Sequence, residues 1–223
     1  MSDFETEPVR GLPELLPKGE EVLWQGAPQW GALAVRVFQA RKMAIYFALL
    51  FFWRIGVSLF SGMPVDEAIQ AALPVIMLSL APVGFLAGMG WLTSYVSVYT
   101  ITTRRVVMRI GIVFSISVNI PFKTITSADL RTYRKGNGDI WLTLAPAGQR
   151  VSYVALWPHV RPWRFTPVQP MLRGVPKAAE VAEILANALK TSLDEDEAAK
   201  GKEDGAAVAE KETRAMPATN AGQ

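Results

Sequence analysis

Two long apolar runs, separated by a short acidic loop, constrain this chain more than any other feature. Residues 43–60 contain one charge, Arg54, and residues 68–93 contain none. A transmembrane helix needs about 20 apolar residues. Because lipid cannot hydrogen-bond exposed peptide groups, each run is expected to form an α-helix. A buried hairpin of a soluble protein is the alternative, but no other segment is apolar enough to cover two such helices. The sequence therefore predicts a transmembrane hairpin over residues 41–95.

The charges around the hairpin predict its orientation. The connecting loop carries only acids, Asp66 and Glu67, whereas bases flank the hairpin on both sides: Arg36, Arg41 and Lys42 before it, and Arg104, Arg105 and Arg109 after it. By the positive-inside rule, both termini are expected in the cytoplasm and the loop outside. The acidic, polar residues 1–10 do not resemble a cleavable signal peptide, so targeting is assigned to the first span.

The residue inventory argues against an enzyme or a metal protein. The chain has 223 residues, no cysteine and one histidine, His159, which lies in a proline-rich segment without an acid nearby in sequence. Disulfides, thiolate chemistry and histidine-rich metal sites are therefore excluded. The glycines around Asn137 suit a turn, since no phosphate-loop lysine and serine follow them. We expect a non-enzymatic protein without a cofactor.

The hairpin is predicted to separate a short lead-in from one domain. Residues 1–40 are rich in turn-forming residues, but residues 22–24 are an apolar cluster, which is either a short strand or an aromatic plug. Residues 31–39 are either an interfacial helix at the membrane surface or a simple extension of the first span. Residues 96–190 are the expected domain, and this length suits one domain of about 100 residues.

Short alternating segments within residues 96–190 predict an antiparallel sheet. A hairpin-turn signal lies at residues 135–138. Residues 157–176, with five prolines, are expected to be irregular, and residues 177–189 show a helical pattern that would cap the sheet. Residues 191–223 carry eight acids and four bases with few large apolar side chains, so a disordered tail is expected. The expected strands are residues 96–101, 105–110, 113–120, 122–134, 139–144 and 149–156.

Several motifs resemble a known family. Residues 99–107, Gly111 and residues 120–125 resemble the bacterial pleckstrin-homology-like (PH-like) domain of small membrane proteins, and residues 17–24 resemble its lead-in. A closer resemblance, to the photosynthetic complex assembly proteins of purple bacteria, rests on motifs spread over the chain. These are residues 4–13, 24–28, 41–47, 162–165 and 170–173. The likeness covers about residues 4–190.

This resemblance implies a fold and a function. The implied fold is an α+β membrane protein, in which a two-helix hairpin precedes a PH-like sheet of seven strands capped by a C-terminal helix. The implied role is non-enzymatic assembly of the photosynthetic reaction centre and its core light-harvesting antenna, in the cytoplasmic or intracytoplasmic photosynthetic membrane. Client subunits, the reaction-centre H subunit among them, are the implied partners.

Candidate interface residues lie in both parts of the chain. Arg54 either reaches the outer headgroups or pairs with a polar group of a partner, and Trp53 suits an interfacial belt or a partner surface. Gly84 and Gly88 form a small-xxx-small pair, which permits close approach of the first span, a second copy or a larger complex. In the domain, bases and aromatic residues are interleaved: Arg131, Arg134, Lys135, Trp157, Arg161, Trp163, Arg164, Phe165 and Arg173.

The basic and aromatic set is compatible with three interpretations. It suits a protein interface, it suits anionic lipid headgroups, or the tryptophans pack on the sheet while the arginines face water. A lipid- or ligand-binding sensor is therefore the alternative to an assembly factor. Nucleic acid is disfavoured as a partner, because the charge excess is small and no recognition helix is evident.

Overall fold

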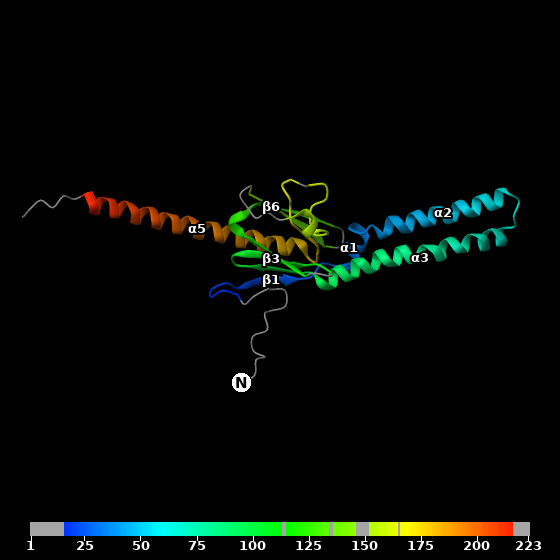
Figure 1. Cartoon of the computed structure of the whole chain (residues 1–223), viewed down its shortest axis with the longest axis horizontal. Coiled ribbons are helices and arrows are strands. Elements are labelled where there is room, and N and C mark those ends of the chain that lie inside the picture. The colour runs from blue at the N-terminus through cyan, green and yellow to red at the C-terminus, as the bar shows by residue number, and fades with distance from the viewer. Residues whose placement is uncertain (1–15, 113–114, 134–135, 146–151, 165, 216–223) are drawn as a thin grey trace, which may run out of the picture.

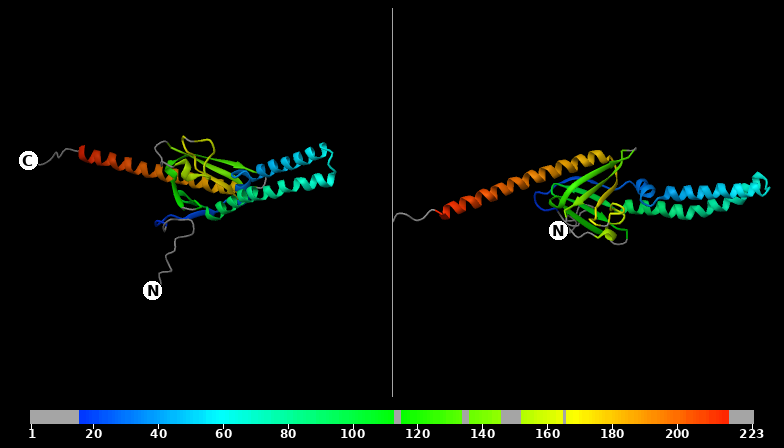
Figure 2. Two further views of the ribbon diagram at one scale, coloured as in Figure 1. Left: turned by 45° about the vertical axis from the view of Figure 1, so that its right-hand side comes forward. Right: turned by 90° about the horizontal axis from the view of Figure 1, so that it is seen from above.

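The computed structural model describes residues 16–112, 115–133, 136–145, 152–164 and 166–215. Figure 1 shows an elongated molecule with a sheet domain at its centre. A helical hairpin projects from one side of this domain and a long C-terminal helix from the other, and the two further views in Figure 2 show the same arrangement.

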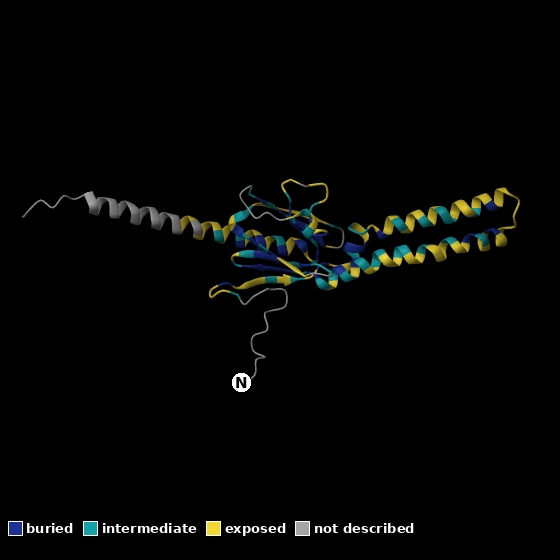
Figure 3. Cartoon of the chain, in the orientation of Figure 1, coloured by how far each residue is buried: buried dark blue, intermediate teal, exposed yellow. Residues whose placement is uncertain are grey.

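The hairpin consists of helices α2 (Ala40–Phe60) and α3 (Val65–Val96). Both predicted apolar runs are therefore helical, and each helix begins about three residues before its run. Asp66 and Glu67 fall in the first turn of α3, where their charge is favourable to the helix dipole. Only 6% of the most apolar window of each helix is buried, and Figure 3 shows mostly exposed and intermediate residues along both. Both helices are long and apolar enough to cross a membrane.

A separate short helix, α1 (Trp30–Arg36), precedes the hairpin. The chain bends between α1 and α2 because Gln39 adopts a left-handed conformation, with φ of 57°. Of the two alternatives for residues 31–39, the simple extension of the first span is therefore wrong. Leu33 and Ala34 are buried, and the amide of Gln29, just before α1, donates to the carbonyl of Gly174 at 2.8 Å. Helix α1 thus lies between the hairpin and the sheet domain.

Within the described residues, seven strands form two antiparallel sheets. The first sheet has the order β1-β2-β3-β4, with β1 (Val22–Gly26), β2 (Val98–Thr102), β3 (Arg105–Ile110) and β4 (Ile116–Pro121). A short 3₁₀ turn, η2 (Phe122–Thr124), leads to the second sheet, β5-β6-β7. Its strands are β5 (Ile125–Thr132), β6 (Gly138–Leu144) and β7 (Met171–Val175). Residues 22–24 are thus part of a strand, and seven strands agree with the fold that the resemblance implies.

The core lies between the two sheets and the first turns of α5 (Ala178–Ala215). Strand β6 alternates buried and half-buried residues along its length, as expected for a strand with one face on a core. Helix α5 contributes Ala178, Val181 and Leu185 to this core, which confirms the predicted capping helix. The predicted β5–β6 hairpin is also confirmed, with Gly136 at φ of 74° in its turn.

Three expectations for the second half of the chain are wrong. Of the strand expected over residues 149–156, the part Tyr153–Leu156 is instead a short helix, α4, and residues 149–151 lie outside the described part. The segment expected to be irregular contains β7, which pairs with β6. Helix α5 does not end near residue 190 but continues to Ala215. Its distal sequence is rich in alanine, glutamate and lysine, which have high helix propensity even without a core to pack on.

Candidate functional site: a basic cleft between the hairpin and the sheet domain

A cleft of about 530 Å³ lies where the hairpin meets the sheet domain. Its walls come from the end of α1, the start of α2 and the β5-β6-β7 sheet. Six cationic side chains and one carboxylate, Asp139, line it. The six cations are Arg36, Arg41, Lys42, Arg131, Arg161 and Arg173.

Separate elements bring these cations together. Arg36 is the last residue of α1, and the bend at Gln39 turns the chain so that Arg41 and Lys42 occupy the first turn of α2. Arg131 lies near the end of β5. Arg173 lies on β7, which is held beside β6 by antiparallel pairing. The site therefore depends on the packing of α1 against the sheet.

Aromatic rings form part of the cleft wall. The guanidinium carbon of Arg36 lies 3.0 Å from the ring centroid of Tyr133, and that of Arg131 lies 5.6 Å from the same centroid. The guanidinium carbon of Arg161 lies 4.8 Å from the ring of Trp141. Cation–π contacts of this kind favour arginine over lysine and fix the plane of the guanidinium.

The one carboxylate of the cleft is already engaged by neutral groups. Asp139 accepts hydrogen bonds from the hydroxyl of Tyr133 and the amide of Gly174, both at 2.8 Å. Partial burial raises the pKa of Tyr133, as does its hydrogen bond to Asp139, and this outweighs the opposite effect of Arg36 and Arg131. Among the described residues, the ion pairs are Arg105–Glu20 and Lys177–Glu180. None of the six cations of the cleft is thus ion-paired there.

Two residues of the cleft wall each carry a buried side-chain donor that lacks an acceptor within the described structure. These are Nε of Arg173 and Nε1 of Trp141. The Nη2 atom of Arg173 does donate to the carbonyl of Val160 at 2.7 Å, so the side chain is fixed while its Nε remains unsatisfied. A buried donor without an acceptor costs about 1–3 kcal/mol. The cleft therefore combines uncompensated positive charge with unused hydrogen-bond donors.

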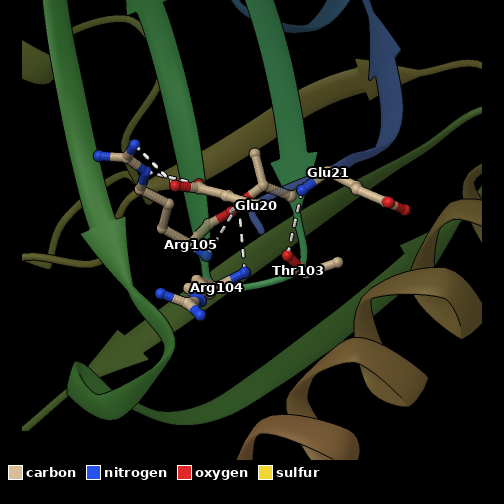
Figure 4. Close-up of polar contacts among 6 residues, drawn as sticks. Glu20, Glu21, Thr103, Arg104 and Arg105 are labelled. Carbon is tan, nitrogen blue, oxygen red and sulfur yellow. Dashed lines mark hydrogen bonds and ion pairs between the residues drawn. The ribbon is translucent and has the colours of Figure 1, made fainter. Parts of the chain in front are cut away.

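The opposite end of the domain shows charge that is compensated. Arg105 donates to Glu20 through Nε at 2.7 Å and Nη2 at 2.9 Å, and Thr102 donates to the same carboxylate at 2.7 Å. Figure 4 shows this cluster, with the neighbouring contact from the amide of Glu21 to Thr103. Burial alone would raise the pKa of Glu20, but the bonds from Arg105 and Thr102 hold it below its usual value.

His159 is a structural residue in the described structure. Its side chain is fully buried, Nε2 lies 3.1 Å from Oγ of Ser97, and Nδ1 is hydrogen-bonded to the hydroxyl of Tyr99. Because that hydroxyl accepts the amide of Arg173, its own proton is available to Nδ1, and Nε2–H then donates to Ser97. Burial, followed by the charge of Arg173, lowers the pKa of His159 to about 3. Ser97 and Tyr99 are also fully buried, so no substrate can reach this network.

The predicted domain residues only partly assemble into one site. Arg131, Arg161 and Arg173 meet in the cleft. Trp157 is 54% exposed and makes an edge contact with Phe38, 5.9 Å between ring centroids. Trp157 does not line the cleft, and neither do Trp163, which is 87% exposed, and the exposed Arg164. Arg134, Lys135 and Phe165 lie outside the described residues.

The predicted hairpin residues lie far from the cleft. Trp53 is exposed, and Arg54 donates to the hydroxyl of Ser58 at 2.7 Å, one turn nearer the outer end. Gly84 and Gly88 face open space, since a Cβ added at either position would have no neighbour within 4 Å. An apolar groove of about 510 Å³ runs between α2 and α3 and includes Gly84. Its other lining residues include Phe47, Phe51, Phe52, Ile76 and Leu80.

The sequence reasoning missed several important residues. Arg36, Arg41 and Lys42 were expected to orient the hairpin, but they were not expected to line one site together with the bases of the domain. No local sequence motif marked Tyr133, Trp141 or Asp139 as a residue of the site. The close helix approach occurs at Gly90, where an added Cβ would lie 2.7 Å from Cα of Ala34 in α1. Gly84 and Gly88 make no such contact.

Comparison with known proteins identifies a family and a relative. Residues 45–189 match the family described as "Bacterial PH domain". A protein of Rhodobacter capsulatus, described as "Uncharacterized 23.7 kDa protein in puhA 5'region", is 37% identical over 213 residues, which is 93% of this chain and 97% of that protein. No solved structure matches.

Proposed function

The chain belongs to the bacterial PH domain family, and from that premise we propose that it is a non-enzymatic assembly factor of the photosynthetic apparatus. Its clients are subunits of the reaction centre, the H subunit included, and of the core light-harvesting antenna. It binds them within the membrane through the hairpin and next to the membrane through the sheet domain.

The association with photosynthesis rests on the relative from Rhodobacter capsulatus, whose description places it in the 5' region of puhA. The two chains match over nearly their whole lengths, so the hairpin and the domain are both shared. This neighbourhood supports a photosynthesis-related role for the present chain. The narrower role in assembly is our own proposal.

The observation that carries the proposal is the open groove between α2 and α3. Its walls are almost entirely apolar, it includes the exposed Gly84, and no described part of the chain fills it. In lipid, helices associate through close packing at small residues rather than through the hydrophobic effect. A transmembrane helix of a client subunit suits this groove, because it is apolar along its length and can approach closely at Gly84.

A rigid joint supports the idea that the hairpin and the domain act together. The close approach of α1 and α3 at Gly90 leaves no room for a side chain. The hydroxyl of Ser94 in α3 donates to the carbonyl of Pro28, and the fully buried Ser97, which follows α3, contacts His159. A client bound to the groove would therefore sit in a fixed position relative to the sheet domain.

The proposed location is the inner or intracytoplasmic membrane, with both termini in the cytoplasm. The low burial of α2 and α3 supports membrane insertion over a soluble hairpin. The basic residues flanking the hairpin and the acidic loop between its helices support this orientation. The open faces at Gly84 and Gly88 also suit a second copy of the chain.

A complementation experiment tests the assembly role. Deletion of the gene is expected to lower the amount of assembled reaction-centre and antenna complex while pigment synthesis continues. Complementation with Gly84→Leu, which fills the groove, should restore less complex than the wild type does. Gly56→Leu is the matched control, because Gly56 also faces open space on the hairpin but does not line the groove. Unchanged complex levels in the deletion strain would remove the proposal.

The second candidate function is a membrane-anchored sensor for a lipid or another ligand, and the basic cleft favours it. The deletion strain separates the two candidates. A sensor would change the response to membrane composition without a direct effect on complex assembly, and its activity would depend on the cleft rather than on Gly84.

A further inference from the structure

The cleft holds six cationic side chains against one carboxylate, so most of its positive charge is uncompensated. Arg36 and Arg131 both contact the ring of Tyr133, and Arg41 and Lys42 line the same space. The single carboxylate, Asp139, is occupied by Tyr133 and Gly174. Repulsion among such cations destabilises the folded state, and an anion placed between them would convert it into attraction.

The side chains of the cleft specify the chemistry of that anion more closely. Nε of Arg173 and Nε1 of Trp141 belong to residues that line the cleft, but both atoms are buried in its wall. The exposed guanidinium groups of Arg36 and Arg131 are therefore the donors available to the anion. Most of the cleft cations are arginines, whose planar guanidinium groups match the oxygen geometry of phosphate through paired hydrogen bonds.

The size and the place of the cleft agree with a phosphate ester. A volume of about 530 Å³ falls within the range of about 300–1,000 Å³ that is typical of small-molecule sites. Arg41 and Lys42 belong to the first turn of α2. If α2 enters the membrane there, the cleft opens at the depth of the cytoplasmic headgroups, where each basic residue attracts anionic lipid by about 1 kcal/mol.

We infer that the basic cleft binds a phosphate-bearing anion, and that the headgroup of an anionic membrane lipid supplies it. Arg36 and Arg131 hold the phosphate from two sides, with Arg41 and Lys42 lining the same space. This inference goes beyond the proposed assembly function, and it deepens the second candidate function by naming the ligand of the same cleft.

The test uses the full-length chain in a neutral maltoside detergent and measures its thermal unfolding midpoint. Four probes are titrated at constant ionic strength: diheptanoyl phosphatidylglycerol, diheptanoyl phosphatidylcholine, sodium phosphate and, as a source of carboxylates, hexaglutamate. A ligand that binds only the folded state raises the midpoint in a saturable way. We expect phosphatidylglycerol to raise it and phosphatidylcholine, which has no net charge, to leave it nearly unchanged.

The variant R36Q/R131Q should bind phosphatidylglycerol about tenfold more weakly or worse, because it loses two charge-assisted contacts. The matched control R104Q/R164Q removes the same charge from two exposed arginines outside the cleft and should bind like the wild type. R41Q/K42Q is a second cleft variant that should also bind phosphatidylglycerol more weakly. Because both side chains are exposed, the variant should fold normally, so weaker binding would not result from a loss of folding.

The outcomes distinguish the source of the phosphate. A midpoint raised by sodium phosphate alone, and lost in R36Q/R131Q, would support the phosphate chemistry but reassign its source to a soluble anion. No shift with phosphatidylglycerol or with sodium phosphate would overturn the inference, as would equal losses in the cleft and control variants. Stabilisation by hexaglutamate but by neither phosphate probe would also overturn it, because the cleft would then bind protein carboxylates.

Discussion

Two faces of α3 differ in what surrounds them. On one face, Gly90 lies against Ala34 of α1 with no space for a side chain, and Ser94 is bonded to the carbonyl of Pro28. On another face of the same half of the helix, Gly84 and Gly88 face open space. One helix thus has a glycine that is required for packing and two glycines that the fold itself does not use.

This difference separates structure from function within one element. The face of α3 that carries Gly90 fixes the hairpin to the sheet domain and so helps to form the basic cleft. The face that carries Gly84 and Gly88 keeps a small-residue surface that no described part of the chain covers. A glycine motif in a membrane helix is therefore informative only when its neighbours are known, since the more conspicuous Gly84–Gly88 pair is not the one at the internal contact.

The largest effect is expected at Gly90, the glycine that the packing of α3 on α1 requires. Gly90→Leu places a side chain against the backbone of α1 and should destabilise the protein by about 3 kcal/mol, the upper part of the range for overpacking. Gly88→Leu is the matched control. It meets no neighbour and removes a helix-disfavouring glycine, so its unfolding midpoint in detergent should equal or exceed that of the wild type. Equal midpoints for the two variants would contradict the distinction.

The second prediction concerns the polar network of Ser97, Tyr99 and His159, which lies at the domain end of α3. The pKa of His159 falls from 6.5 to about 3 in the folded protein, so the unfolded state binds more protons between these values. Stability is therefore fully present above about pH 6.5 and decreases as the pH falls toward 3. We expect a loss of about 2 kcal/mol between pH 6.5 and pH 5.

His159→Gln tests this assignment, because glutamine can hydrogen-bond but does not titrate. The variant should be less stable than the wild type at pH 7, and it should lack most of the loss between pH 6.5 and pH 5. The measurement is thermal unfolding in detergent at several pH values. An unchanged pH dependence in the variant would show that another group is responsible.

The smallest effect is expected at the far end of the domain, away from the joint. Glu20→Gln weakens the bonds from Arg105 and Thr102 and should cost about 1.5 kcal/mol, as for a charge-assisted hydrogen bond. The exposed neighbour allows a matched control, Glu21→Gln, which should be nearly neutral.

The pH dependence of the Glu20 contribution has a defined sign. Because the pKa of Glu20 is lowered from 4.5, its contribution is present above about pH 4.5 and is lost as the pH falls through the folded-state value. The loss of stability that involves Glu20 should therefore begin below the range from pH 6.5 to pH 5, in which the titration of His159 is measured. Phospholipid binding by the basic cleft should not change in Glu20→Gln, and a change there would show that the two ends of the domain are coupled.

Features with a strong local signal were predictable from the sequence. The apolar runs of α2 and α3, the alternating strands from β2 to β6 and the turn at Gly136 all follow from periodicity and turn chemistry. The family resemblance, confirmed by the match of residues 45–189, implied seven strands. The described structure reaches that number with β1 in the lead-in and with β7, which was not expected, rather than with a strand over residues 149–156.

Features that depend on distant contacts were not predictable. Strand β7 is five residues long with an internal glycine, and only its pairing with β6 makes it a strand. The extension of α5 to Ala215 follows from the high helix propensity of its residues. The many charges and few large apolar residues of the same segment had instead suggested a disordered tail. The cleft requires Arg36, Arg131 and Arg173 to meet through the packing of α1 on β7, and no local pattern encodes that arrangement.

The most direct test of the central claim is photocrosslinking inside the membrane of photosynthetically growing cells. A photoreactive amino acid at Phe52, which lines the groove, is compared with one at Trp53, which is similarly exposed but does not line it. The account predicts that Phe52 forms adducts with reaction-centre or antenna subunits, identified by mass spectrometry, and that Trp53 forms far fewer. Adducts with lipid or a second copy alone, or the same client adducts from both positions, would contradict it.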